Sequence, residues 1–379
     1  MKNANNEKRR RFQIAFIGTL MLLMFPAHPA KSSPPLQRGK RIAFERAKKL
    51  DNGISISWLE QTWGDSLLKR EGVGRADMAL LKKLGFKTIR LPVAFRYFEE
   101  KKIPLSEVLA RTDKVWKMCR KYGFRLIIDY HYGNLNNENH VQATHNIINT
   151  WLAVATHYLK ADADALFFEI YNEPPPIDPQ VWKDAACNIV AAIRKLDSRR
   201  TLLVGASNYN SIYELSRFVP LKDNNIIYAF HFYEPFLFTH QGAGWVGDQV
   251  ATTGVPFPYN EENFPPINPK AIGTAGEQNY NKYHLDGNEQ SVKDKLQIVK
   301  NWGQDNAVPL ICSEYGSYNK YADLTSRCQY TRAVRQALKS LGIPGILWDY
   351  NTNFSIFNGS PSVEDLPDCM KDAIGYTGK

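Results

Sequence analysis

Eight short apolar runs, separated by stretches of helical period, are the feature that most constrains the fold of this chain. The runs with strand character are residues 53–59, 86–93, 124–131, 166–173, 201–206, 225–233, 309–316 and 343–350. Helical periodicity lies between them at residues 77–84, 106–121, 181–196, 296–304 and 325–341. Strands that alternate with helices pair in parallel through right-handed crossovers. Eight such units predict an α/β fold, a closed (β/α)8 TIM barrel.

The barrel accounts for most of the chain as a single domain. The chain has 379 residues, of which 44% are hydrophobic, so it can bury a large core. No glycine-rich dinucleotide turn follows the first run, which argues against an open doubly wound sheet. We therefore assign residues 51–379 to one domain, and residues 31–50, which are basic and Pro-rich without an apolar period, to a leader segment.

The first thirty residues have the layout of a signal peptide. Lys8 and three arginines precede an apolar run at residues 14–25, and a Pro- and Ala-containing stretch leads to Ala30. This run is short for a membrane span, so cleavage near Ala30 is favoured over an uncleaved anchor. We expect a secreted or periplasmic protein that has no stable membrane association after cleavage.

Charge and cysteine content exclude several other classes of function. Removal of residues 1–30 takes away five cationic residues and Glu7, so the formal net charge falls from +10 to +6. No basic run interleaved with aromatics suggests a nucleic-acid partner. The cysteines are odd in number and lack metal-ligand spacing, so at most one disulfide is expected. They are Cys119, Cys187, Cys312, Cys328 and Cys369.

Polar and aromatic side chains of the kind that do chemistry end most of the predicted strands. In a (β/α)8 barrel these C-terminal strand ends converge on one pocket, where active sites lie. The residues at these positions are Arg90, Asp129, His131, Asn172, Glu173, His231, Tyr233, Glu234, Glu314 and Trp348.

Two of these residues, Glu173 and Glu314, form the most informative pair. A single carboxylate at a buried strand end can be a structural ion pair. Strands four and seven, however, face each other across an eight-stranded barrel, so the two carboxyls can approach one bond from opposite sides. Glycoside hydrolysis uses such a pair, with one acid for the leaving oxygen and one carboxylate for the anomeric carbon.

The ordered set of motifs resembles glycoside hydrolase family 5, a family of cellulases with (β/α)8 barrels and catalytic glutamates after strands four and seven. The resemblance spans about residues 53–351. It rests on Thr88-Ile89-Arg90-Leu91-Pro92-Val93, His131, Asn172-Glu173-Pro174, His231, Tyr233, Glu314-Tyr315-Gly316 and Trp348.

The resemblance implies a role for each matched residue. Glu173 would be the general acid/base and Glu314 the nucleophile of a retaining mechanism, with the carboxyls about 5 to 5.5 Å apart. Arg90 and Tyr233 would hydrogen-bond the nucleophile. The residues that would bind substrate are Arg90, His131, Asn172, His231, Tyr233 and Trp348. No metal and no cofactor is implied.

Further residues could extend the cleft. Residues 235–290, which follow the sixth run, are rich in Pro, Gly and aromatics, and we interpret them as a long loop that forms a cleft wall; a tolerated surface insertion is the alternative. Aromatic side chains near strand ends could stack on sugars. They are Trp58, Trp63, Tyr132, Tyr209, Trp245 and Tyr318.

The expected activity is an endo-β-1,4-glucanase that acts as a monomer on a polysaccharide or oligosaccharide. Xyloglucanase, mannanase and mixed-linkage glucanase activities remain alternatives, as does a non-catalytic glycan-binding barrel. A metal-dependent hydrolase that uses Asp129, His131 and His231 is disfavoured because the first run contains no paired histidines. A Schiff-base aldolase is disfavoured because no lysine ends a strand.

Overall fold

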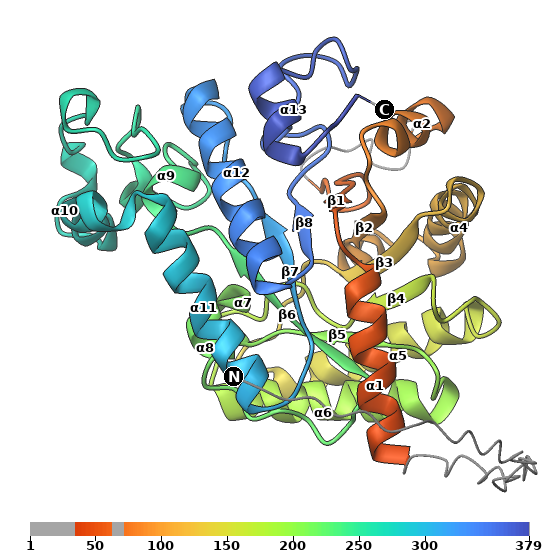
Figure 1. Ribbon diagram of the computed structural model, residues 1–379. Helices are drawn as coiled ribbons and strands as arrows, with labels where there is room; N and C mark the ends of the chain where they lie inside the picture. Colours follow the sequence, from red (N-terminus) through yellow and green to blue (C-terminus); the bar gives the residue numbers. More distant parts are fainter. Residues whose placement is uncertain (1–34, 63–71, 379) are drawn as a thin grey trace, which may run out of the picture. The chain divides into compact units, whose positions relative to one another are not determined.

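The predicted (β/α)8 TIM barrel is confirmed. The computed structural model describes residues 35–62 and 72–378, and eight parallel strands close in the order β1 to β8, with β1 paired to β8 (Figure 1). The strands are β1 (Gly53–Ser55), β2 (Thr88–Val93), β3 (Arg125–Tyr130), β4 (Leu166–Glu169), β5 (Leu202–Val204), β6 (Ile226–Phe232), β7 (Leu310–Tyr315) and β8 (Gly345–Leu347). Almost all their residues are buried, as expected for strands covered by helices on one face and filled by side chains on the other.

Helices surround the strands (Figure 1). They are α1 (Pro35–Lys49), α2 (Arg75–Lys83), α3 (Phe95–Glu100), α4 (Leu105–Tyr122), α5 (His140–His157), α6 (Pro179–Leu196), α7 (Ser207–Asn210), α8 (Ile212–Leu215), α9 (Phe236–Thr239), α10 (Ala275–Asp286), α11 (Glu289–Asp305), α12 (Leu324–Leu341) and α13 (Asp368–Ile374). Helices α4 and α12 end at the glycines Gly123 and Gly342, both at positive φ. A left-handed C-cap stops each helix just before the next strand.

The predicted leader over residues 31–50 is wrong for the part that the structure describes, because Pro35–Lys49 forms helix α1. Ala43, Ala47 and Leu50 are buried against Phe167 and Ile311 at the N-terminal end of the barrel. Their i, i+4, i+7 spacing is helical. Two of the three residues are alanines, whose small side chains give a weak hydrophobic signal among so many basic residues. Residues 31–34 and the predicted signal peptide at residues 1–30 lie outside the described range.

The predicted loop over residues 235–290 is partly helical. It contains α9, α10 and three short 3-10 helices, η1 (Asp248–Val250), η2 (Glu261–Asn263) and η3 (Pro269–Ala271). Phe264 stacks on both Tyr280 and Tyr283, with ring centroids 4.8 and 5.4 Å apart. These aromatics therefore pack on one another. The segment is compact, although its Pro and Asn residues are typical of an open loop.

One disulfide forms between Cys328 and Cys369 and joins α12 to α13, with the Cα atoms 5.7 Å apart. Cys119, Cys187 and Cys312 are free thiols. Within the described residues, none of the helices has the length and apolar character needed to cross a membrane.

Candidate active site

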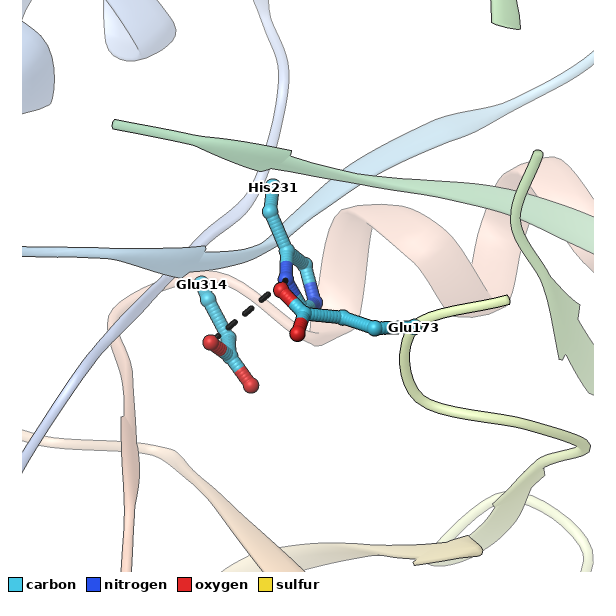
Figure 2. Close-up of side chains that lie close together, drawn as sticks. All are labelled: Glu173, His231 and Glu314. Carbon is cyan, nitrogen blue, oxygen red and sulfur yellow. Dashed lines mark hydrogen bonds and ion pairs between the residues drawn. The ribbon is translucent and has the colours of Figure 1, made fainter. Parts of the chain in front are cut away.

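Glu173 and Glu314 meet at the C-terminal end of the barrel (Figure 2). Glu314 lies within β7, and Glu173 lies in the segment that follows β4. One oxygen of each carboxyl and one ring nitrogen of His231 all lie within 4.8 Å of one another. An irregularity between β6 and β7 places His231 opposite Glu314 in the register, which aims both side chains at the same space.

Both oxygens of the Glu314 carboxyl accept hydrogen bonds. Arg90 Nη1 donates to Oε1 at 2.6 Å, and the Tyr233 hydroxyl donates to Oε2 at 2.8 Å. Hydrogen bonds donated to both oxygens stabilise the carboxylate, so this donor set favours the ionised form. Burial is the largest influence on the pKa of Glu314 and raises it, whereas His231 and Arg90 act to lower that pKa.

Glu173 has a different environment. Its side chain is 34% exposed to the pocket, and its Oε1 lies 2.8 Å from His231 Nδ1. Removal from bulk water raises the pKa of Glu173 to about 7, against the opposing influence of His131 and Arg90. The two carboxyls thus differ in their hydrogen-bond partners and in their exposure, which suits them to the unlike roles of a nucleophile and an acid.

Arg90 links several site residues beneath the pocket. It is fully buried and donates from Nε to Glu169 at 2.7 Å and from Nη2 to Asn172 Oδ1 at 2.7 Å, and Nη2 also lies 3.0 Å from Asp129. Because Arg90 donates to the side-chain oxygen of Asn172, the Nδ2 hydrogens of that side chain are, within the described part of the chain, left for a ligand.

His131 and Trp348 form one side of the pocket. Their rings are parallel within 5°, with centroids 5.6 Å apart. His131 Nδ1 lies 2.6 Å from Asp129 Oδ2, and burial lowers the pKa of His131 to about 3, so the ring is neutral. Trp348 lines the cavity and offers it an aromatic ring of the kind on which a sugar stacks.

A cavity of about 590 Å³ unites these groups. Six of the eight predicted site residues line it, while Arg90 and His231 lie behind them. The cavity is lined by Glu60, His131, Tyr132, Asn172, Glu173, Tyr233, His240, Trp245, Glu314, Trp348, Thr352, Asn353 and Phe354. The structure therefore brings every predicted site residue to one place.

Sequence reasoning missed two buried carboxyls. Glu60 is buried at the cavity edge and accepts a hydrogen bond from the Tyr132 hydroxyl at 2.9 Å, and burial raises its pKa to about 8. Glu169 pairs with Arg90 and accepts from Ser313 at 3.1 Å. Both could have been noticed, because Glu60 directly follows the first apolar run and Glu169 is charged within the fourth.

Some of the other aromatic and acidic candidates line the cavity, and the rest do not. Tyr132 and Trp245 line the cavity, and Trp245 is 59% exposed. Glu234 pairs with Lys295 at 3.6 Å and so lies outside the site, which leaves it a structural role. Trp58 and Tyr318 are buried, Tyr209 is exposed away from the cavity lining, and Trp63 lies outside the described residues.

Comparison with known proteins identifies the family and relatives of this chain. Residues 49–354 match the family model described as cellulase, glycosyl hydrolase family 5. The chain is 32% identical over 349 residues to Endoglucanase 3 of Fibrobacter succinogenes, which covers 85% of this chain but about half (53%) of that protein. It is 29% identical over 304 residues to Endoglucanase C of Acetivibrio thermocellus, covering 74% of this chain and 85% of the relative.

Solved structures agree in fold. A hyperthermophilic endo-beta-1,4-glucanase in complex with substrate superposes with a TM-score of 0.73 at 24% identity, over 88% of this chain and 99% of the other. Thermotoga maritima Cel5A superposes in complexes with cellobiose and with mannotriose, with TM-scores of 0.70 and 0.71 at 23% identity, again over 88% and 99% of the two chains. With the family model matched from the start of the barrel to its eighth strand, this chain belongs to the cellulase family, glycosyl hydrolase family 5.

Proposed function

We propose that this chain is a secreted, retaining endo-β-1,4-glucanase. The observation that carries the proposal is a pair of carboxyls in one cavity with different surroundings. Glu314 accepts hydrogen bonds from two donors, and the pKa of Glu173 is raised to about 7. Oxygens of the two carboxyls lie within 4.8 Å of each other. That supports retention, in which the carboxyls lie about 5 to 5.5 Å apart, over inversion, which needs about 6.5 to 9.5 Å.

In the first step, a Glu314 oxygen attacks the anomeric carbon, while Glu173 donates its proton to the leaving oxygen. The bond to the leaving sugar breaks, and a glycosyl ester forms on Glu314. In the second step, Glu173, now ionised, takes a proton from water, and the water oxygen displaces Glu314 from the sugar. Arg90 and Tyr233 would hold the Glu314 carboxylate in line, and the amide of Asn172 would bond a sugar hydroxyl.

Endo action is supported by the shape of the site and by the relatives. A second cavity of about 570 Å³ shares Thr352 and Asn353 with the first, so space for further sugars continues beside β1 and β8. Both of the curated relatives compared above carry the name endoglucanase. Since one solved neighbour was crystallised with both cellobiose and mannotriose, mannan belongs in any substrate panel.

The test measures reducing sugar released from soluble β-1,4-glucan, mixed-linkage glucan, xyloglucan and mannan, with sizing of the products. We expect the fastest release from β-1,4-glucan, with short oligosaccharides from internal cuts. Glu173→Gln should lower the rate by about 10² to 10⁴ and Glu314→Gln by about 10⁴ or more. A wild type that binds glucan without cleaving it would instead indicate a non-catalytic glycan-binding barrel.

Two further measurements address the mechanism. Proton NMR of the first product should show the β anomer, and a first-formed α anomer would exclude retention. Because Glu173, His231 and Glu314 could together hold a cation, the assay is repeated with a chelator; we expect no loss of activity, and a loss would revive a metal-dependent hydrolase.

Export is a separate part of the proposal. It is supported by the basic and apolar layout of residues 1–30, which lie outside the described structure. Fractionation of cells that express the full chain should place it in the periplasm or the medium, with an N-terminus near residue 31. A full-length cytoplasmic product would contradict this.

A further inference from the structure

A left-handed turn of three non-glycine residues follows β5. Asn208, Tyr209 and Asn210 have φ values of 56°, 61° and 56°, in segment α7. L-residues seldom adopt this conformation even singly, although asparagine tolerates it best. Such strain persists only where the surrounding contacts hold it, and it concentrates at functional sites.

The backbone of this turn is bonded to the chain beside the general acid. The Asn208 N–H donates to Pro175 O at 3.1 Å, and the Tyr209 N–H donates to Pro174 O at 2.8 Å. The two carbonyls belong to the residues directly after Glu173. The turn therefore supports the catalytic segment on its C-terminal side.

The side chain of Asn210 supports the same segment on its N-terminal side. Asn210 is fully buried, and its Nδ2 donates to the main-chain oxygen of Asn172 at 2.5 Å. Gly205 makes room for this amide, since a Cβ there would lie 1.6 Å from Asn210 Oδ1. Among the described residues, Oδ1 itself has no hydrogen-bond partner, so its burial costs stability that the Nδ2 bond only partly offsets.

The bond to the Asn172 oxygen bears directly on Glu173. The peptide group that joins Asn172 to Glu173 is planar, so fixing its oxygen also fixes the nitrogen of Glu173 and the direction of its Cα. The preceding N–H, that of Asn172, is held by Tyr130 O at 3.0 Å. Because the N–H and the main-chain oxygen of Asn172 are both hydrogen-bonded, the remaining freedom of Glu173 is in its side-chain rotamers.

From this geometry we propose that Asn210 is a positioning residue for the general acid, acting through the main chain of Asn172. The inference rests on the proposed function, because it assigns Glu173 the role of proton donor. Asn210 is not among the described residues that line the cavity. Its loss would leave Arg90 and Tyr233 bonded to the nucleophile and would release the peptide group that carries Glu173.

The test compares substrates that differ in their need for an acid. Cellotetraose expels a sugar alcohol, which must be protonated as it leaves. In contrast, 2,4-dinitrophenyl β-cellobioside expels a stable phenolate that needs no proton. The value of kcat/KM on each substrate reports the step that expels the leaving group. A misplaced acid slows the first substrate alone.

Asn210→Gly is the main variant and Asn208→Gly its matched control. Glycine accepts the positive φ at both positions, so neither change adds backbone strain. Only Asn210 loses a side-chain bond to the catalytic segment, since the exposed Asn208 side chain makes none with residues 35–62 or 72–378. Asn210→Asp, which keeps the shape and in its ionised form has no donor, replaces the main variant if Asn210→Gly shows no cooperative thermal unfolding.

We expect Asn210→Gly to lower kcat/KM on cellotetraose about 10- to 100-fold and to change that on the aryl cellobioside less than about threefold. Asn208→Gly should match the wild type on both. Equal losses on both substrates, or no loss on either, would overturn the inference. Wild-type protein that cleaves neither substrate would instead contradict the proposed function.

Discussion

The N-terminal end of the barrel is closed by α1 over an apolar floor, whereas the C-terminal end holds one buried arginine among carboxyls. At the floor, Ala47 and Leu50 pack on Phe167 from β4. At the other end, Arg90 lies within 3.0 Å of Asp129, Glu169 and Glu314. Strands β3, β4 and β7 thus contribute side chains to two buried regions with opposite chemistry.

The contrast separates stability from function. Apolar burial at the floor stabilises the fold, and because the hydrophobic effect is non-directional it requires no specific orientation of the groups in contact. The charged end has more carboxyls than cations, and burial raises the pKa of Asp129 to about 7. A buried ionic cluster is seldom the most stable filling for a core, so the barrel gives up stability there for a preorganised site.

The largest effect is expected for Arg90→Leu. It removes a donor of Glu314 and leaves the buried carboxyls uncompensated, so kcat/KM should fall on the order of 10³-fold and the free energy of unfolding by about 3 to 5 kcal/mol. Activity assays and denaturant unfolding measure both. Arg96→Leu, which removes a half-exposed arginine paired with Glu100, should cost under about 1 kcal/mol and leave kcat/KM unchanged. A stable, active Arg90→Leu protein would remove the contrast between the two ends.

Ala47→Asp tests the floor. A carboxylate placed against Phe167 would lie among the apolar side chains of the described floor, so the free energy of unfolding should fall by about 3 to 4 kcal/mol. The folded fraction should keep the wild-type kcat/KM, since the site lies at the opposite end. Lys48→Asp, on the exposed face of α1, should cost under about 1 kcal/mol. A change in kcat/KM of the folded Ala47→Asp protein would show that the ends are coupled.

The pH profile sharpens the assignment at the catalytic end. Glu173 must be protonated to act as an acid, and its raised pKa is about 7. Activity should therefore be present below this pH and fall about tenfold per unit above it, as the proton is lost. The measurement is kcat/KM on cellotetraose against pH. A profile that stays flat well above pH 8 would assign the acid role to another group.

The smallest effect is expected for Gly342→Ala, at the turn that leads from α12 into β8. Its φ is +65° and no atom of residues 35–62 or 72–378 lies within 4 Å of an added Cβ, so the cost is backbone strain alone, about 1 kcal/mol. Gly244→Ala, which has equal room and no positive φ, should stay within about 0.5 kcal/mol of the wild type. Thermal unfolding compares the two. Equal losses of stability in the two variants would mean that the positive φ of Gly342 does not explain the cost of Gly342→Ala.

Much of the fold and the pocket's main residues could be predicted from local patterns. The alternation of apolar runs with helical periods specifies a parallel barrel, and a barrel gathers its strand ends at one pocket. Strand-end position alone therefore predicts that Glu173, Glu314 and Trp348 lie together. Helix α1 was missed because alanines and basic residues obscure its buried face.

The sequence by itself determined the barrel and the two glutamates, since period and strand-end position are local properties of the chain. Only the tertiary structure decided which groups surround them. Glu60, Glu169 and Asn210 act through contacts between residues distant in sequence, and the ionisation of each carboxyl depends on burial and on neighbours such as Arg90. Burial and charge balance arise only once the strands have closed, so no local pattern records them.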